Sequence, residues 1–176
     1  IDALVRDMPD LRVALWTDGL AGEAVSEECA RVAAEAAILC ESVGCLVEEV
    51  RPPVEGGALR HALDVVFTTN IRQVVQAVLA DQPAAVTEGL LEPITVACFE
   101  AGARHDGVAY EAALRHAQRV AHAMEEFFER FDLLLTPTLA EPPMPLGQLD
   151  MQTDDWDSYF QHLLDAIPFT PLFNVT

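Results

Sequence analysis

The chain has 176 residues and a formal net charge of −19, because 29 Asp and Glu residues outnumber ten basic residues, all of them Arg. A surface this acidic repels phosphate backbones and anionic lipids, which argues against nucleic acids and membranes as partners. The apolar share of 51% is ordinary for a globular protein, and the length suffices for one domain with a sizeable core.

Residues 11–50 are predicted to form a strand–helix–strand unit. Two apolar runs, 13–16 and 45–50, have the length and composition of short strands. Two strands joined through one helix are most simply a parallel pair with a right-handed crossover. This unit places the chain in the α/β class.

The helix between these strands has recognisable start and end signals. Ser26 is a suitable N-cap, and Gly44 stands where a glycine often follows a helix. Spacings of four, three and four residues put a set of apolar side chains on one face, which we expect to be buried. This set comprises Val32, Ala36, Leu39 and Val43.

Residues 57–130 are predicted to form a mostly helical insert. The first helix is interrupted at Pro83, and a second begins near Pro93, a suitable first-turn proline. Asp106 is the candidate cap of a third helix. The stripes that we expect to be buried are Leu59, Leu63, Phe67, Ile71, Val74 and Val78 in the first helix, and Leu114, Ala117, Ala121, Met124 and Phe128 in the third.

Residues 131–150 contain a third strand followed by a Pro-rich loop. The run Leu133–Thr136 has no polar alternation, so we expect a buried strand that is covered on both faces. Pro137 should mark its end, because proline cannot donate a hydrogen bond to a neighbouring strand.

A last helix and an extended tail are predicted over residues 154–176. Asp154 or Asp155 is expected to cap the helix. Pro168 and Pro171 are expected to hold the tail in an extended conformation.

The sequence offers no clear catalytic residue. It contains no lysine, and its only serines, Ser26, Ser42 and Ser158, lie outside any G-x-S-x-G turn. Few positive charges are available to activate a cysteine thiolate. We therefore assign no catalytic residue to this chain.

Metal and cofactor sites are not expected either. His116 and His122 are six residues apart, which puts them on different faces of a helix. The four cysteines show no metal-ligand spacing and are interpreted as small apolar residues. The paired carboxylates are interpreted as solvated faces of an acidic chain. The sequence therefore predicts no metal and no cofactor.

Three stretches together resemble the C-terminal part of the amidase signature family. They are LRVALWTDGL near the start, FDLLLTPTLAEPPMPLG at residues 131–147 and PFTPLFNVT at the end. Each motif alone is modest in specificity, but their order and spacing are hard to explain otherwise. The resemblance runs over nearly the whole chain and is strongest to bacterial amidases of the type that includes cyclic-amide and nylon-oligomer hydrolases.

The resemblance implies that the chain is the C-terminal part of a single larger α/β amidase domain. The family hydrolyses carbon–nitrogen bonds with a Ser–Ser–Lys triad, and here that triad would lie upstream of Ile1. Because the chain starts with Ile rather than Met, we expect it to belong to a longer polypeptide. The parent is expected to act on linear amides, and this portion alone is expected to be inactive.

The resemblance also implies candidates for the wall of a substrate pocket. In relatives, the stretch that corresponds to the end of this chain runs close to the nucleophile. On that ground Phe169, Phe173, Asn174 and Thr176 are substrate-binding candidates, with the two aromatic rings against an apolar acyl chain. The alternative for the two Phe residues is a plain core role. Weaker candidates are Thr136 and Thr138.

Two other interpretations remain open at this point. One is a non-catalytic binding or regulatory module derived from an amidase-like fold, and the other is an unrelated acidic α/β interaction protein. Under the amidase interpretation, the expected partners are a small-molecule amide and the N-terminal part of the same protein, with a homodimer as a further candidate. The absence of a signal peptide or membrane-spanning run in the sequence predicts a cytoplasmic protein.

Overall fold

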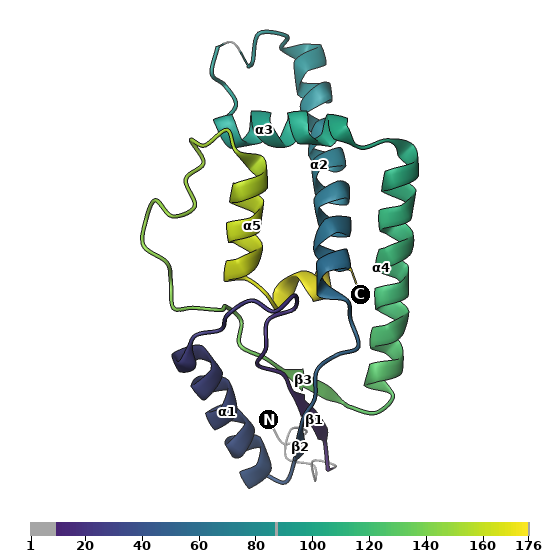
Figure 1. Cartoon of the computed structure of the whole chain (residues 1–176), viewed down its shortest axis with the longest axis vertical. Coiled ribbons are helices and arrows are strands. Elements are labelled where there is room, and N and C mark those ends of the chain that lie inside the picture. The colour runs from purple at the N-terminus through teal and green to yellow at the C-terminus, as the bar shows by residue number, and fades with distance from the viewer. Residues whose placement is uncertain (1–9, 87, 176) are drawn as a thin grey trace, which may run out of the picture.

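A computed structural model describes residues 10–86 and 88–175 of the chain. The elements follow one another along the chain and form an elongated molecule, with the sheet at one end and most of the helices at the other (Figure 1). In order they are β1 (Arg12–Leu15), α1 (Glu27–Ser42), β2 (Leu46–Glu49), α2 (Gly56–Asp81), α3 (Pro93–Ala101), a 3-10 turn (Gly102–Arg104), α4 (Gly107–Phe128), β3 (Leu133–Leu135), α5 (Trp156–Ala166) and a 3-10 helix (Thr170–Asn174).

The sheet is parallel, in the strand order β2-β1-β3. Val13 in the central strand pairs with Val47 of β2 and with Leu133 of β3. The parallel pairing of β1 with β2 through α1 confirms the predicted strand–helix–strand unit. Both β2 and β3 are edge strands of this sheet, so among the described residues each has one side without a strand partner.

The expectation that the third strand is covered on both faces is wrong for the described residues. Leu133 is 50% exposed, and Leu134 and Leu135 are only half-buried. β3 lies at the edge of the sheet, whereas Val13 and Ala14 of the central strand are buried. An unbroken apolar run shows that a strand is suited to burial on both faces, but it does not show that other segments cover those faces.

The N-terminal helix begins and ends where the sequence predicts. The Cys29 N–H donates to the Ser26 hydroxyl oxygen (3.3 Å), and Gly44 has a φ of 97°, a left-handed conformation that suits glycine. The buried face, however, differs from the prediction. α1 buries Ala33 and Ala37, whereas Leu39 is 67% exposed. The small side chains of Ala33 and Ala37 let the backbone of α1 lie close to the sheet. The larger apolar side chains of this helix then lie on its outer face.

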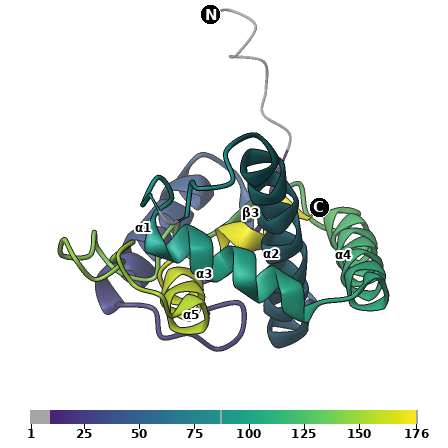
Figure 2. The same cartoon turned by 90° about the horizontal axis from the view of Figure 1, so that it is seen from above.

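The helical insert is confirmed, and its long members pack side by side. α2 contacts α4 along much of its length, and α3 crosses α2 at the end far from the sheet (Figures 1 and 2). Pro93 lies in the first turn of α3, and the Asp106 carboxylate accepts a hydrogen bond from the Ala109 N–H (2.8 Å), as predicted for a cap. The same structure corrects which residues α2 and α4 bury.

In α4 the buried face is shifted by one residue in three of its four positions. Ala113, Val120 and Phe127 are buried in place of the predicted Leu114, Ala121 and Phe128, while Met124 is buried as expected. In α2, Leu59 is buried, but three other members of the predicted stripe, Phe67, Val74 and Val78, are exposed. A residue shift turns a helix by about 100°, so neighbouring stripes compete and the packing partner selects between them.

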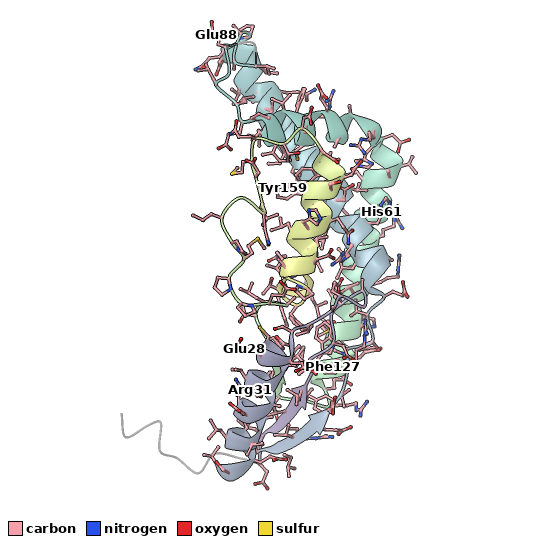
Figure 3. All side chains as sticks on the ribbon, turned by 60° about the vertical axis from the view of Figure 1, so that its left-hand side comes forward. Glu28, Arg31, His61, Glu88, Phe127 and Tyr159 are labelled. Atoms are coloured by element: carbon pink, nitrogen blue, oxygen red, sulfur yellow. The ribbon has the colours of Figure 1, made fainter. Side chains whose placement is uncertain are left out.

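The main core joins the sheet to the helices. Ala14 of β1, Met124 and Phe127 of α4, and Phe169 near the C-terminus belong to one buried cluster. Figure 3 labels Phe127 at the end of α4 that lies beside the sheet. The Trp16 and Phe169 rings meet edge to face, with centroids 5.1 Å apart, a favoured geometry for aromatic pairs.

A second cluster closes the helical end of the molecule. Trp156, at the start of α5, packs on Ile94 and Cys98 of α3 and stacks on Phe67 of α2. Its indole N–H donates to Asp64 (2.8 Å), so the polar atom of this buried ring is satisfied. This contact anchors α5 against α2 and α3.

The C-terminal segment confirms one prediction and corrects another. Asp155 caps α5, accepting a hydrogen bond from the Ser158 N–H (3.0 Å). The tail, in contrast, is not extended, because Thr170–Asn174 forms a 3-10 helix. Pro171 lies in the first turn of this helix, where a φ near −65° is suitable and the missing N–H costs nothing.

Candidate functional site

The most favourable place for a ligand lies where the chain leaves β1 and β3. The chain runs from β1 to β2 on one side of the central strand and then returns past β1 to β3 on the other side. The strand order therefore reverses between β1 and β3. In open α/β sheets, ligands bind outside the carboxyl ends of the strands at such a point. The segments that begin here are residues 16–26 after β1 and residues 136–155 after β3.

Backbone hydrogen bonds hold these segments and the end of α5 together. The Ser26 N–H donates to the Ala140 carbonyl (2.8 Å), and the Ala140 N–H donates to the Ala166 carbonyl (3.0 Å). Ala140 is therefore bound on both sides and is buried. Three segments far apart in sequence thus form one framework near the sheet.

A pocket of about 730 Å³ lies within this framework. Its volume is in the range of pockets that enclose small organic ligands, roughly 300–1,000 Å³. One wall comes from the loop after β1, one from the Pro-rich loop and one from α5. The lining is predominantly apolar and consists of Glu23, Ala24, Leu139–Met144, Gln148, Leu149, His162, Leu163 and Asp165–Ile167.

Charged groups gather on one side of the pocket. Arg60 of α2 forms ion pairs with Glu23 and with Asp165, the latter at 2.8 Å. The side chains of Arg60 and Glu23 are only 12% and 5% exposed, so this pair is held in a poorly solvated position. A Cβ atom at Gly19 would clash with the Glu23 side chain, and the Ala21 N–H also donates to the Glu23 carboxylate (2.8 Å).

The serine side chains all take part in local capping. The Ser26 oxygen accepts from the start of α1, the Ser42 hydroxyl donates to the Leu39 carbonyl (2.7 Å), and the Ser158 hydroxyl donates to the Asp155 carboxylate (2.7 Å). A serine nucleophile needs an adjacent base to activate its hydroxyl. The contacts of these serines are those of helix ends, and the chain has no lysine to serve as that base.

Two cysteine thiols are poorly suited to act as nucleophiles. Burial, with a smaller contribution from the Asp64 carboxylate, raises the pKa of Cys98 to about 12. Desolvation and the neighbouring Cys40 raise the pKa of Cys45. Because the thiolate is the reactive form, both groups are held in the unreactive protonated state at neutral pH.

The substrate-binding candidates from the sequence lie near the C-terminus but do not line this pocket. Phe169 is 0% exposed and packs on Trp16 as a core residue. Phe173 and Asn174 are exposed on the 3-10 helix, and Thr176 lies outside the described residues. The structure thus brings Phe173 and Asn174 together on one exposed turn and separates them from the buried Phe169.

The weaker candidates occupy the start of the segment that leads into the pocket. Thr136 is half-buried and Thr138 exposed, on either side of the buried Pro137. Neither is among the lining residues, which begin at Leu139. They lie at the carboxyl end of β3, as the sequence predicted.

Sequence reasoning missed the charged residues of the pocket. Glu23 lies in the loop after β1, and Asp165 lies on α5, 142 positions later in the numbering. The signal that was available is topological: the loops after two neighbouring parallel strands meet at one edge of the sheet. That signal identifies the two loops, but the contribution of α5 depends on its packing.

Metal centres and membrane-spanning helices concern the described ranges, 10–86 and 88–175. Within them, His, Cys, Asp and Glu side chains form no group of three or more with the arrangement of a metal centre. In the same part of the chain, no helix is both long and apolar enough to cross a bilayer.

Comparison with known proteins decides the family. The family model described as Amidase matches residues 3–176. The chain belongs to the amidase family. This amidase-family chain is also 29% identical over 130 residues to the lipoamidase of Enterococcus faecalis, a match that covers 73% of this chain and 18% of that protein.

Solved structures agree with the family assignment. The chain superposes on 6-aminohexanoate cyclic dimer hydrolase with a TM-score of 0.77 and 25% identity, covering 96% of this chain and 37% of the hydrolase. A bacterial aryl acylamidase of the amidase signature family shares the fold, with a TM-score of 0.59 and 20% identity over 97% of this chain and 36% of that one. The amidase-family chain therefore spans little more than a third of the length of these solved structures.

Proposed function

We propose that this chain is the C-terminal portion of an amidase that hydrolyses linear amides. In this proposal it supplies walls of the substrate pocket, while the Ser–Ser–Lys triad lies in a preceding part of the polypeptide. The observation that carries the proposal is the match of the amidase family over residues 3–176 in a chain without a single lysine. A family that uses a lysine base cannot complete its catalytic centre from these residues.

The exposed apolar surface at the sheet end supports the same proposal. Leu39 of α1, Val43 directly after this helix, Leu46 of β2 and Leu133 of β3 are each at least half exposed. Apolar side chains that gather on a protein surface usually mark contact with another segment or partner, and the first three of these residues belong to α1 and β2 or to the turn between them, two elements that contact each other. We infer that the rest of the amidase domain covers them and continues the sheet at its open edges.

The pocket beside β1 and β3 supports a role in substrate binding. It is apolar, it contains a few fixed polar groups, and it lies at the topological switch point of the sheet. In the proposal, the pocket receives part of the amide substrate. In the same proposal, Phe173, Asn174 and Thr176 contact the substrate nearer the reacting bond. Phe169 supports the 3-10 helix from the core.

The experiment that tests the proposal uses the complete polypeptide and a serine-directed fluorophosphonate probe. We expect hydrolysis of a simple linear amide such as hexanamide, and we expect the labelled serine to map outside the 176 residues. The matched control is the 176-residue chain alone, which should be neither labelled nor active. Labelling of Ser26, Ser42 or Ser158, or turnover by the separate chain, would overturn the proposal.

The same experiment separates this function from a non-catalytic module. A regulatory protein with an amidase-like fold would show no labelled serine and no turnover in any form. A larger labelled polypeptide supports the amidase.

The cellular compartment is part of the proposal. All four cysteines are free thiols, and free thiols are typical of the reducing cytoplasm. We therefore propose a cytoplasmic enzyme. Fractionation of the native cells with an antibody to this chain tests the assignment.

A further inference from the structure

We propose that the pocket beside β1 and β3 binds the amine side of the substrate, as an apolar chain that ends in a positively charged amine. This inference rests on the proposed amidase function and adds the chemical class of the group that the pocket selects. It concerns residues that the sequence did not single out, chiefly Glu23, Leu163 and Asp165.

The apolar residues of the lining indicate that most of the ligand is apolar. Leu163 and Ile167 project from the end of α5, while Leu139, Met144 and Leu149 come from the Pro-rich loop. Side chains of this kind favour methylene groups, since each buried methylene is worth about 0.8 kcal/mol. A short alkyl chain therefore matches the larger part of the surface.

The carboxylates of the pocket favour a ligand with a positively charged end. Glu23, Glu141 and Asp165 line the pocket, and a single guanidinium, that of Arg60, is paired with two of them. His162 also lines the pocket. With its imidazole neutral, three carboxylates on three walls stand against one guanidinium, so the lining as a whole carries an excess of negative charge. Ionised carboxylates only accept hydrogen bonds, so they favour a ligand that donates and repel one that ends in a carboxylate.

Asp165 is the carboxylate best placed to meet the amine. Within the described parts of the chain, its two donors, Arg60 Nη2 (2.8 Å) and Gln161 Nε2 (2.9 Å), both bind Oδ1. The Asp165 side chain lines the pocket and is 45% exposed, and neither of these donors uses Oδ2, so we assign the contact with the amine to Oδ2. The two donors also fix the carboxylate in place, which reduces the ordering cost of binding.

Glu23 acts as a supporting charge rather than as the contact atom. Its side chain is nearly buried and is engaged by Arg60 and by the Ala21 N–H. By pairing with Arg60, it offsets the positive charge that would otherwise neutralise Asp165. The lining thus remains attractive to a cation although an arginine lies beside it.

The test compares the binding of three ligands of equal chain length to the complete polypeptide by calorimetry at pH 7. The ligands are n-hexylammonium, 1-hexanol and hexanoate. We expect hexylammonium to bind most tightly, roughly fivefold better than hexanol, which is the size expected of one partly exposed charge pair. Hexanoate should bind most weakly.

Two substitutions locate the effect. Asp165→Asn should remove the preference for hexylammonium over hexanol and leave the affinity for hexanol within about twofold, because the apolar lining is unchanged. Glu41→Gln, on the exposed end of α1, makes the same change in net charge and should keep the preference. Leu163→Trp should weaken all three ligands by filling the pocket.

Several results would overturn the proposal. They are equal or tighter binding of hexanol or hexanoate, no binding of any ligand, and an unchanged preference in Asp165→Asn. The order of the three affinities is measured on the unchanged protein, so it tests the proposal even if a variant does not fold. Binding in the expected order without amide hydrolysis would refute the proposed enzyme while supporting the pocket, and hydrolysis without that order would refute the pocket alone.

Discussion

The helices α1 and α4 both pack beside the small sheet, yet they bury side chains of very different size. α4 places Met124 and Phe127 in the main core, whereas the buried residues of α1 are only Ala33 and Ala37. The large apolar side chains of α1, such as Leu39, face solvent. The side under α4 therefore has a core of large side chains, although Leu114 and Phe128 of this helix are exposed, while the side at α1 buries only alanines and leaves its larger apolar side chains for another segment.

The comparison shows how a folded unit can be well packed and still be a part of something larger. The core at α4 is closed by aromatic contacts, with the Phe127 and Phe131 rings 4.9 Å apart. The surface of α1 has no such partner within the described residues. This difference supports the proposal that the rest of the amidase domain lies against α1, and the following predictions test it.

The largest effect is expected in the core under α4. In the complete polypeptide, Phe127→Ala should reduce the free energy of unfolding by about 3–5 kcal/mol, since it empties a buried aromatic site. Urea unfolding followed by circular dichroism measures the change. The matched control is Phe128→Ala, one residue along and 40% exposed, which should cost less than half as much. Equal losses would contradict the burial pattern of α4.

The next effect decides whether α1 is covered. Leu39→Ala in the complete polypeptide should cost about 2 kcal/mol or more if a further segment buries this side chain, and about 0.5 kcal/mol or less if it stays in water. We expect the larger value, again by urea unfolding. Glu41→Ala on the same helix is the control, with an expected change within about 0.5 kcal/mol. A cost at Leu39 no larger than at Glu41 would refute the covering of α1.

A smaller effect concerns the cap that holds α5 at the far end from α1. Hydrogen bonds from the Ser158 side chain and then its backbone N–H lower the pKa of Asp155 from its ordinary value of 3.8. A lowered pKa in the folded state means that the charged cap stabilises the fold above pH 3.8 and loses this contribution as the pH falls further. Asp155→Ala should therefore lower Tm at pH 7.

The pH dependence supplies the control for this prediction. The difference in Tm between the wild type and Asp155→Ala should shrink at pH 3 compared with pH 7, because acid protonates the native carboxylate. Differential scanning fluorimetry at the two values measures it. A difference that stays constant between pH 7 and pH 3 would mean that the charge of Asp155 contributes nothing.

The smallest perturbation is chemical labelling of the helical end. Cys98 is buried in the cluster around Trp156, and its raised pKa, about 12, keeps the thiol protonated at pH 8. An aromatic disulfide reagent should leave Cys98 unmodified in the native protein and modify it in urea, as peptide mass mapping would show. Rapid modification of Cys98 in the native protein would mean that the helical end opens easily and that the cluster around Trp156 is not stably packed.

Local features of the fold were predictable because they depend on residues close in sequence. Ser26, Asp106 and Asp155 each accept a hydrogen bond from a backbone N–H three residues later, so the cap and its partner lie in one short segment. The same holds for Gly44, whose positive φ ends α1. The parallel strand–helix–strand unit follows from connectivity of the same short range.

The buried faces and the pocket were less accessible. Phe127 and Phe128 are both aromatic and adjacent, and only the tertiary packing, including the contact with Phe131, places the first in the core. The pocket joins Glu23 and Asp165 through Arg60, three residues on different segments. The periodicity of apolar residues does not predict such contacts between distant segments, because it describes one helix or strand at a time.

The sequence by itself determined the family, the order of strands and helices, and the absence of a lysine base, because these are properties of residue identity and local spacing. Only the tertiary structure decided that Phe169 is a core residue, that α1 buries its alanines, and that the loops after β1 and β3 form a pocket with α5. These features arise from contacts between segments distant in sequence, where packing and charge pairing choose among arrangements that local patterns allow equally.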